Sequence, residues 1–256
     1  METDARRWIE ALRNSQNRLA VVLGPLGPDQ LTGPSYDTDW TIAQVLSHLG
    51  SQAEIFQLFL DAALAGEQAP GSEVFGPIWD TWNAKPPILQ AADGLQAGED
   101  QVVWLEARTD GDLALMRLDL FGMDLDAAGL ARMRLAEHAV HTWDVAVALD
   151  SAAVISADAV ALLVDTADQL LGRLARPQGV DLSVQVTTHR PERVFHLVVT
   201  GESVTLGPWD SGTVEAELEL PAEAFLRLVY GRLDPAHTPE GIKGELGPLR
   251  RLFPGF

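Results

Sequence analysis

Apolar residues recur at helical spacing through most of the first 150 residues of the chain. Residues 3–23 predict an amphipathic helix that ends at Gly24-Pro25. The apolar positions near one face of this helix are Trp8, Leu12, Leu19 and Val22. After a turn-rich stretch at 27–39, we expect Thr38 or Asp39 to cap a second helix. The apolar side chains of that helix are Trp40, Ile42, Val45, Leu49, Phe56 and Leu60.

Two further helices complete the first half. Pro86-Pro87 is a typical helix start, and the helix is expected to run to about Ala107. Asp124-Leu125-Asp126 introduces a fourth helix that continues to about Leu149. The stretch 65–83, rich in Gly, Pro and aromatic residues, is predicted to be a long loop. Four helices in this order predict a bundle, in which facing helices commonly hold metal ligands.

The pattern changes after Asp150. A helix at about 155–174 is followed by β-branched or alternating segments, separated by turn residues, that predict strands at 182–187, 194–200, 203–206 and 214–220. Pro221 starts a further helix through Tyr230, and the tail 246–256 is expected to form a short helix and an apolar plug. The predicted fold class is therefore α+β, with a four-helix bundle at 1–150 and a smaller α+β domain at 151–256.

Composition narrows the choice of partners. The 256 residues carry a formal net charge of −19, so nucleic acid and anionic membrane surfaces are poor partners. The apolar runs are too short to span a bilayer, and the N-terminus lacks the features of a signal peptide, so we expect a cytoplasmic protein. The absence of cysteine excludes disulfides, thiolate metal sites and a cysteine nucleophile, so thiol chemistry would need an imported thiol.

Glu137 and His141 are the strongest candidates for chemistry. Four residues apart on a helix, they lie on the same face and offer two ligands to a divalent metal. His48, on the second helix, can supply the third ligand, and three protein ligands with an open position are typical of a catalytic metal site. His138 and His141 also share a face, so spacing alone does not separate the pair Glu137/His141 from the pair His138/His141.

Ordinary structural roles compete with each of these assignments. A single histidine such as His48 is more often a packed core residue than a ligand, and Glu137 can pair with Arg134 at i−3. A carboxylate on a largely buried helix is costly without a partner, and a metal ion offsets that cost. Asp144 either accepts a hydrogen bond from the second nitrogen of His141 or serves as a capping or surface carboxylate.

Two segments carry a family resemblance. The run from Asp39 to Leu49, DWTIAQVLSHL, resembles the second helix of DinB-like metal-binding bundles, and the fourth helix of these bundles is similar to Glu137-x-x-x-His141-x-x-Asp144. The second half, with VYGRL at 229–233, GEL at 244–246 and FPGF at 253–256, is similar to the C-terminal, sterol-carrier-like domain of mycothiol-dependent maleylpyruvate isomerases.

This resemblance implies a zinc ion held by His48, Glu137 and His141, which favours Glu137 over His138. It also implies an arginine of the C-terminal domain near the metal, for which Arg232 is the first candidate. The other candidates are Arg227 and Arg193, and the alternative for Arg232 is an ordinary surface arginine.

Together these observations predict an enzyme in which the metal lowers the pKa of an external thiol, mycothiol by resemblance. The thiolate adds to an electrophilic small molecule, giving S-transfer or cis–trans isomerisation. A metal-bound water would instead give a hydrolase, with Asp144, Glu54 or a group not identified from the sequence as the general base. A third hypothesis is a non-catalytic module whose second half binds an apolar or lipid ligand.

The stretch 65–83 contains three aromatic residues, Phe75, Trp79 and Trp82. These side chains either close over a substrate or, as we favour, pack against the rest of the protein.

Overall fold

The computed structural model describes residues 4–37 and 39–255, and the chain divides into two compact units at 1–153 and 154–256. The first unit is mainly helical, and the second contains a four-stranded sheet. This arrangement confirms the α+β class with a helical part preceding a sheet domain. No helix among the described residues is long and apolar enough to cross a bilayer.

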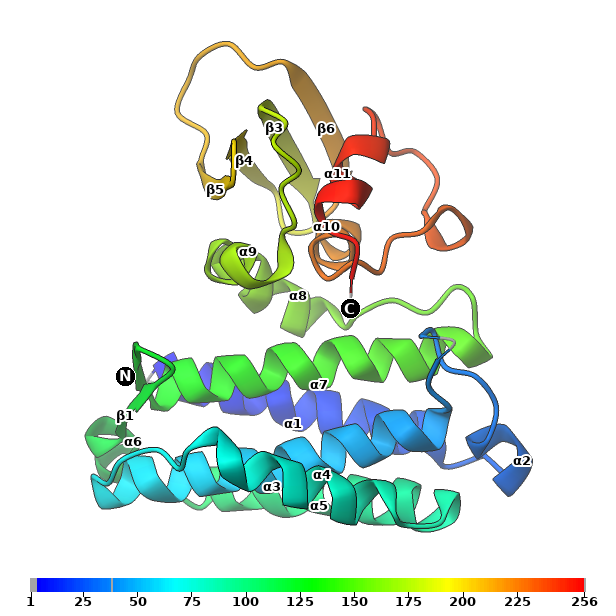
Figure 1. Cartoon of the computed structure of the whole chain (residues 1–256), viewed down its shortest axis with the longest axis vertical. Coiled ribbons are helices and arrows are strands. Elements are labelled where there is room, and N and C mark those ends of the chain that lie inside the picture. Colours follow the sequence, from blue (N-terminus) through cyan, green and yellow to red (C-terminus); the bar gives the residue numbers. More distant parts are fainter. Residues whose placement is uncertain (1–3, 38, 256) are drawn as a thin grey trace. The chain divides into compact units, whose positions relative to one another are not determined.

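Four long helices form the first unit and lie side by side (Figure 1). They are α1 (Asp4–Leu23), α3 (Ile42–Ala65), α5 (Pro87–Glu106) and α7 (Ala127–Leu149). Helix α3 packs against α5, and α1 packs against α7. The apolar stripes predicted from the sequence face inward, and Leu19, Leu46 and Leu49 belong to one buried cluster. The four-helix bundle is thus built by burial of these stripes.

The start of one long helix differs from the prediction, and the start of another agrees with it. Helix α3 is capped by Thr41 rather than by Asp39, while Thr38 lies outside the described residues. Thr41 Oγ1 accepts from the Gln44 amide at 3.2 Å and the Gln44 side chain accepts from the Thr41 amide at 2.8 Å, which is a complete capping box. Helix α7 is capped by Asp126, the last residue of the segment predicted to introduce it, and the Asp126 carboxylate accepts from the Gly129 amide at 2.8 Å.

A β-hairpin that was not predicted from the sequence directly precedes α7. Its strands are β1 (Arg117–Leu120) and β2 (Met123–Asp126). Leu118, Leu120 and Leu125 are buried in it. An alternating pattern of only four residues per strand carries too weak a periodic signal to be recognised. The short helices α2 (Pro28–Leu31) and α6 (Asp110–Leu115) were not predicted for the same reason.

The predicted loop at 65–83 is wrong in part, because it contains a 3₁₀ turn, η1 (Ser72–Val74), and helix α4 (Phe75–Asn83). Trp82 is buried, and its Nε1 donates to Glu54 at 2.8 Å. A methyl group on Gly50 would lie only 2.2 Å from the Trp82 ring, so the indole packs directly against the glycine backbone of α3. Trp82 therefore fixes α4 to the bundle, in agreement with the packing interpretation.

The second unit begins with α8 (Ala157–Leu163), the turn η2 (Val164–Thr166) and α9 (Asp168–Leu174), so the single helix predicted at 155–174 is interrupted. The Thr166 hydroxyl donates to the Leu163 carbonyl at 3.2 Å, a local bond that competes with helix hydrogen bonding. The sheet has the order β5-β4-β3-β6, and only the β3–β6 pairing is parallel. Its strands are β3 (Leu182–His189), β4 (Arg193–Thr200), β5 (Ser203–Pro208) and β6 (Ala216–Pro221).

The remaining elements match the predicted tail closely. Helix α10 (Ala222–Val229) follows β6, a 3₁₀ turn η3 (Pro235–His237) comes next, and α11 (Gly247–Leu252) precedes the buried Phe253. Gly231 ends the α10 region with φ 72°, and a Cβ there would lie 2.2 Å from the Gly255 backbone. Only glycine accommodates both the positive φ and this close approach.

Candidate metal centre

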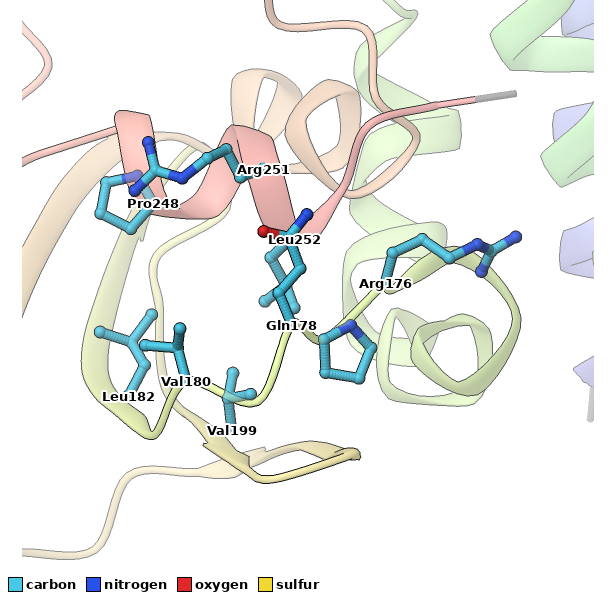
Figure 2. A pocket seen from close by; sticks show the side chains of 9 residues that line it. Arg176, Gln178, Val180, Leu182, Val199, Pro248, Arg251 and Leu252 are labelled. Atoms are coloured by element: carbon cyan, nitrogen blue, oxygen red, sulfur yellow. The ribbon is translucent and has the colours of Figure 1, made fainter.

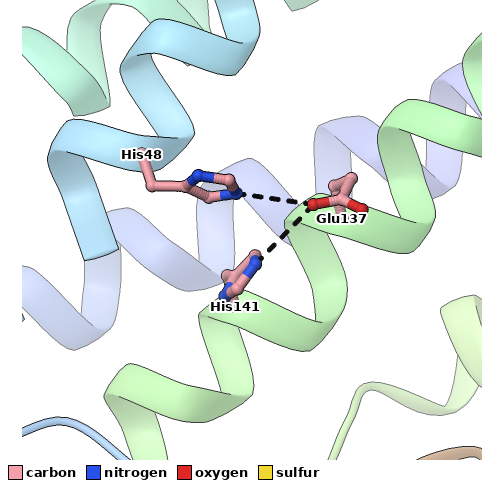
Figure 3. Close-up of side chains that lie close together, drawn as sticks. All are labelled: His48, Glu137 and His141. Atoms are coloured by element: carbon pink, nitrogen blue, oxygen red, sulfur yellow. Dashed lines mark hydrogen bonds and ion pairs between the residues drawn. The ribbon is translucent and has the colours of Figure 1, made fainter. Parts of the chain in front are cut away.

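His48, Glu137 and His141 converge on one point of the bundle (Figure 3). Helix α7 stacks Glu137 and His141 on one face, and His48 reaches them from α3. Glu137 Oε2 lies 3.5 Å from His48 Nε2 and 3.6 Å from His141 Nε2. All three ligand atoms lie within 4.8 Å of one another. The structure therefore brings together the three residues that the sequence analysis proposed as ligands.

The spacing and chemistry of these three groups fit a divalent cation. With metal–ligand bonds of about 2.0–2.1 Å, two ligands of a tetrahedral ion lie roughly 3.3–3.4 Å apart. The two distances to Glu137 Oε2, 3.5 and 3.6 Å, are close to that value. Two imidazoles and one carboxylate are a donor set that zinc and several other divalent metals accept. The side chains are 20% (His48), 38% (Glu137) and 11% (His141) exposed. The Glu137 carboxylate is thus the most solvent-accessible of the three groups.

The protonation states also favour a cation. Burial acts to raise the pKa of the Glu137 carboxyl, but hydrogen bonds from His141 and His48 outweigh it and hold that pKa below its usual value. Burial lowers the pKa of the His48 imidazole, against the opposing hydrogen bond to Glu137. An ionised carboxylate and a neutral imidazole are the forms that bind metal.

Asp144 and Trp40 support the two imidazoles. Asp144 Oδ2 lies 2.8 Å from His141 Nδ1, and the Asp144 side chain is 1% exposed. A carboxylate at this position fixes the tautomer and orientation of a ligating histidine, which is the first of the two roles that the sequence left open for Asp144. The Trp40 ring stacks on His141 at 6.4 Å between centroids and lies 5.2 Å from His48. The sequence pattern marks Trp40 only as an apolar residue, and its position just before the helix of His48 is the one signal that links it to the cluster.

His138 faces away from this cluster. It lies about 100° around the helix from Glu137, because α-helices have 3.6 residues per turn. Its Nδ1 is 2.8 Å from Ser15 Oγ and its Nε2 is 2.9 Å from Gln16 Oε1, so it bonds to α1. Burial moves the pKa of His138 well below the usual value, which keeps this imidazole neutral. His138 is a buried, hydrogen-bonded core histidine.

Arg134 also differs from the alternative considered from the sequence, a pairing with Glu137. It is buried and bonds to Gln101 and to the carbonyl of Leu49 instead. Glu137 is thus left to the two imidazoles, although the Arg134 charge still acts on it through space.

The three candidate arginines of the second unit have different surroundings. Arg193 is bound to the carboxylate of Asp165, and Arg227 is bound to that of Glu223, each through two hydrogen bonds. Arg232 is buried and donates from Nη1 to the Tyr230 carbonyl at 2.8 Å. Arg193 and Arg227 thus have evident structural roles, and a role for Arg232 in catalysis stays a prediction.

One cavity in the second unit bears on the apolar-ligand hypothesis. It lies between β3, β4 and α11 and has a volume of about 190 Å³ (Figure 2). Its apolar lining includes Val180, Leu182, Val199 and Leu252. Pockets that hold drug-sized ligands are usually about 300–1,000 Å³, so this cavity is small for such a ligand.

The fold and the cluster define a class of protein: a helical bundle with a candidate metal site on facing helices, followed in the chain by an α+β unit. The sequence profile of the mycothiol maleylpyruvate isomerase N-terminal domain matches residues 12–146, more than half of the chain. The chain therefore belongs to the mycothiol maleylpyruvate isomerase family, which confirms the family predicted from the sequence.

Solved structures agree in fold. The crystal structure of the mycothiol-dependent maleylpyruvate isomerase superposes with a TM-score of 0.68 at 15% identity, over 96% of this chain and 97% of that chain. A histidine-to-alanine mutant of that enzyme gives a TM-score of 0.67 at the same identity and coverage. At 15% identity this likeness establishes the fold. No curated protein sequence shows significant similarity to the chain.

Proposed function

We propose that this protein is a metal-dependent enzyme that activates a low-molecular-weight thiol, mycothiol, for addition to an electrophilic small molecule. The observation that carries the proposal is the convergence of His48, Glu137 and His141, in a chain of the mycothiol maleylpyruvate isomerase family. Zinc is the metal that we propose. The family is one of enzymes, so catalysis is the first expectation. The two imidazoles and the carboxylate offer a metal site at which the reaction can take place.

The residues of the chain have distinct parts in this scheme. His48, Glu137 and His141 hold the metal, and Asp144 fixes the His141 ring so that its Nε2 faces Glu137 Oε2. A divalent metal supplies one effect: it deprotonates a coordinating thiol and so provides a thiolate at neutral pH. Trp40 gives one side of the two imidazoles an apolar wall, which limits access of water. We propose that Arg232 binds an anionic group of the substrate.

The reaction class follows from thiolate chemistry. The sulfur forms a bond to one carbon of a conjugated cis double bond, the resulting single bond rotates, and expulsion of the same thiolate restores the double bond in trans form. No atom is gained or lost, so the thiol acts as a catalyst in isomerisation. If the thiolate instead stays on the substrate, the product is an S-conjugate.

The hydrolase alternative has less support from the site. It requires a general base, and the two candidates named from the sequence are already engaged: Asp144 contacts His141, and Glu54 accepts a hydrogen bond from Trp82. Glu54 is six residues from His48, which turns it to a different face of α3. The apolar-ligand alternative rests on the cavity of about 190 Å³ in the second unit, and its small volume argues against it.

A metal analysis tests the proposal most directly. We expect about one equivalent of zinc in the purified protein, and loss of that zinc in His48→Ala and His141→Ala with the helical circular dichroism spectrum retained. His189→Ala is the matched control, since this histidine lies on β3 and bonds to Glu219. Isomerisation of a cis-configured conjugated keto acid should require both zinc and mycothiol. Zinc-free active protein, or activity indifferent to the thiol, would contradict the proposal.

A further inference from the structure

Arg134 is a buried cation beside the metal site that the scheme above leaves without a function. It lies on α7, three residues before Glu137, and is 1% exposed. It makes no ion pair with the part of the chain that the structure describes, and its Nη1 has no hydrogen-bond partner there. Burial lowers the pKa of Arg134 to about 10, which still leaves the guanidinium charged near neutral pH. Burial of an unpaired charge is expensive, so a stabilising role in the core alone does not explain this arginine.

The hydrogen bonds of Arg134 join three helices. Its Nε donates to Gln101 Oε1 of α5 at 2.7 Å, and its Nη2 donates to the Leu49 carbonyl of α3 at 3.0 Å. Gln101 in turn donates from Nε2 to the Ala53 carbonyl of α3 at 2.8 Å. The planar guanidinium holds two acceptors at fixed directions, which a lysine ammonium does not reproduce.

The hydrogen bonds of Arg134 lie at the level of α3 that carries His48. Leu49 directly follows His48, and Arg134 is one helical turn before Glu137. The distance of 3.5 Å between His48 and Glu137 therefore depends on how α3 is set against α7 at this level. Functional constellations require placement within roughly 0.5 Å, so a small slip of α3 would misplace His48.

We infer that Arg134 is a positioning residue of the metal centre: through Leu49 and Gln101 it holds α3 so that His48 meets Glu137 and His141. This inference rests on the proposed function, since it requires that the cluster binds metal. A positioning role and a purely electrostatic role predict opposite changes in metal affinity when Arg134 is replaced. A cation near a divalent metal repels it, so removal of the charge alone would tighten metal binding. Loss of positioning weakens it.

The test measures zinc affinity by competition with a chromophoric chelator, on the full chain at about pH 7. Arg134→Met removes the charge and both hydrogen bonds at similar volume, and Arg134→Lys keeps the charge but loses the fork. We expect both variants to bind zinc about 10–100-fold more weakly, the range found when groups that orient ligands are removed. The cobalt-loaded variants should also show altered visible absorption bands, because these report ligand geometry.

Leu130→Ala is the control, since Leu130 is buried on α7 one turn before Arg134 and carries no polar group. It should lower the melting temperature of the metal-free protein while leaving zinc affinity within about threefold of the unmodified chain. Zinc affinity in Arg134→Met equal to or tighter than that of the unmodified chain would overturn the positioning role. If Arg134→Met does not fold, Arg134→Lys and Gln101→Leu decide, and unchanged affinity in both overturns it. An unmodified chain that binds no zinc would instead refute the proposed function.

Discussion

Replacing Asp144 with Asn should weaken metal binding about tenfold. The Asp144 carboxylate is buried and lies 2.8 Å from His141 Nδ1, so the two groups form a charge-assisted hydrogen bond once Nδ1 carries the proton. Such a bond contributes about 1.5–3 kcal/mol, against about 0.5–1.5 kcal/mol for a neutral one. Asn retains the shape and one acceptor, so the expected loss is about 1–1.5 kcal/mol, and 1.4 kcal/mol corresponds to a tenfold change.

The assay is chelator competition at about pH 7 on Asp144→Asn and on a matched control, Asp150→Asn. Asp150 follows the last residue of the same helix, and its Oδ1 accepts from the Ala152 amide at 3.0 Å, away from the cluster. We expect tenfold weaker zinc binding in the first variant and no change beyond about twofold in the second. Circular dichroism should show the same helix content in both. An Asp144→Asn protein that binds zinc as tightly as the control would refute the idea that this carboxylate orients His141.

Three further predictions follow from the same structure. The pKa of His138 is lowered in the folded state, so below about pH 6.5 the unfolded chain takes up a proton that the folded chain does not. The free energy of unfolding of the metal-free protein, measured in urea, should therefore fall by about 1 kcal/mol between pH 7 and pH 5.5. His138→Gln should reduce this fall. Gly94→Ala should destabilise by about 1–3 kcal/mol because a Cβ there lies 2.3 Å from the Leu46 carbonyl, whereas Gly172→Ala on α9 meets nothing within 4 Å and should not lower the melting temperature; equal effects would contradict this packing argument. Zinc at 100 times its dissociation constant should stabilise the protein by about 2.7 kcal/mol, and a similar shift in His141→Ala would place the metal elsewhere.

Local sequence patterns were sufficient for the long elements of this protein. The helices α1 and α5 lie within a residue of their predicted positions, because each has several repeats of its apolar period. Helix α10 and the four strands of the second unit are shorter, but Pro221 and the turn residues between the strands mark their ends in the sequence. The elements that were missed, such as α4, α6 and the hairpin before α7, contain at most two or three turns or four residues per strand. Their residues are fixed by contacts from elsewhere, as Trp82 is by Gly50 and Glu54.

The candidate site also has features that the sequence predicts and features that only the tertiary structure determines. The pairing of Glu137 with His141 is a property of one helix and is visible from spacing alone. The choice between Glu137 and His138 is not, since it depends on which side of α7 faces α3 and which faces α1. The contact of His48 with Glu137 and the bonds of Arg134 to Gln101 and Leu49 are likewise tertiary. A helical period determines which side chains share a face, whereas the rotation and register of packed helices, set by the whole core, determine which faces meet.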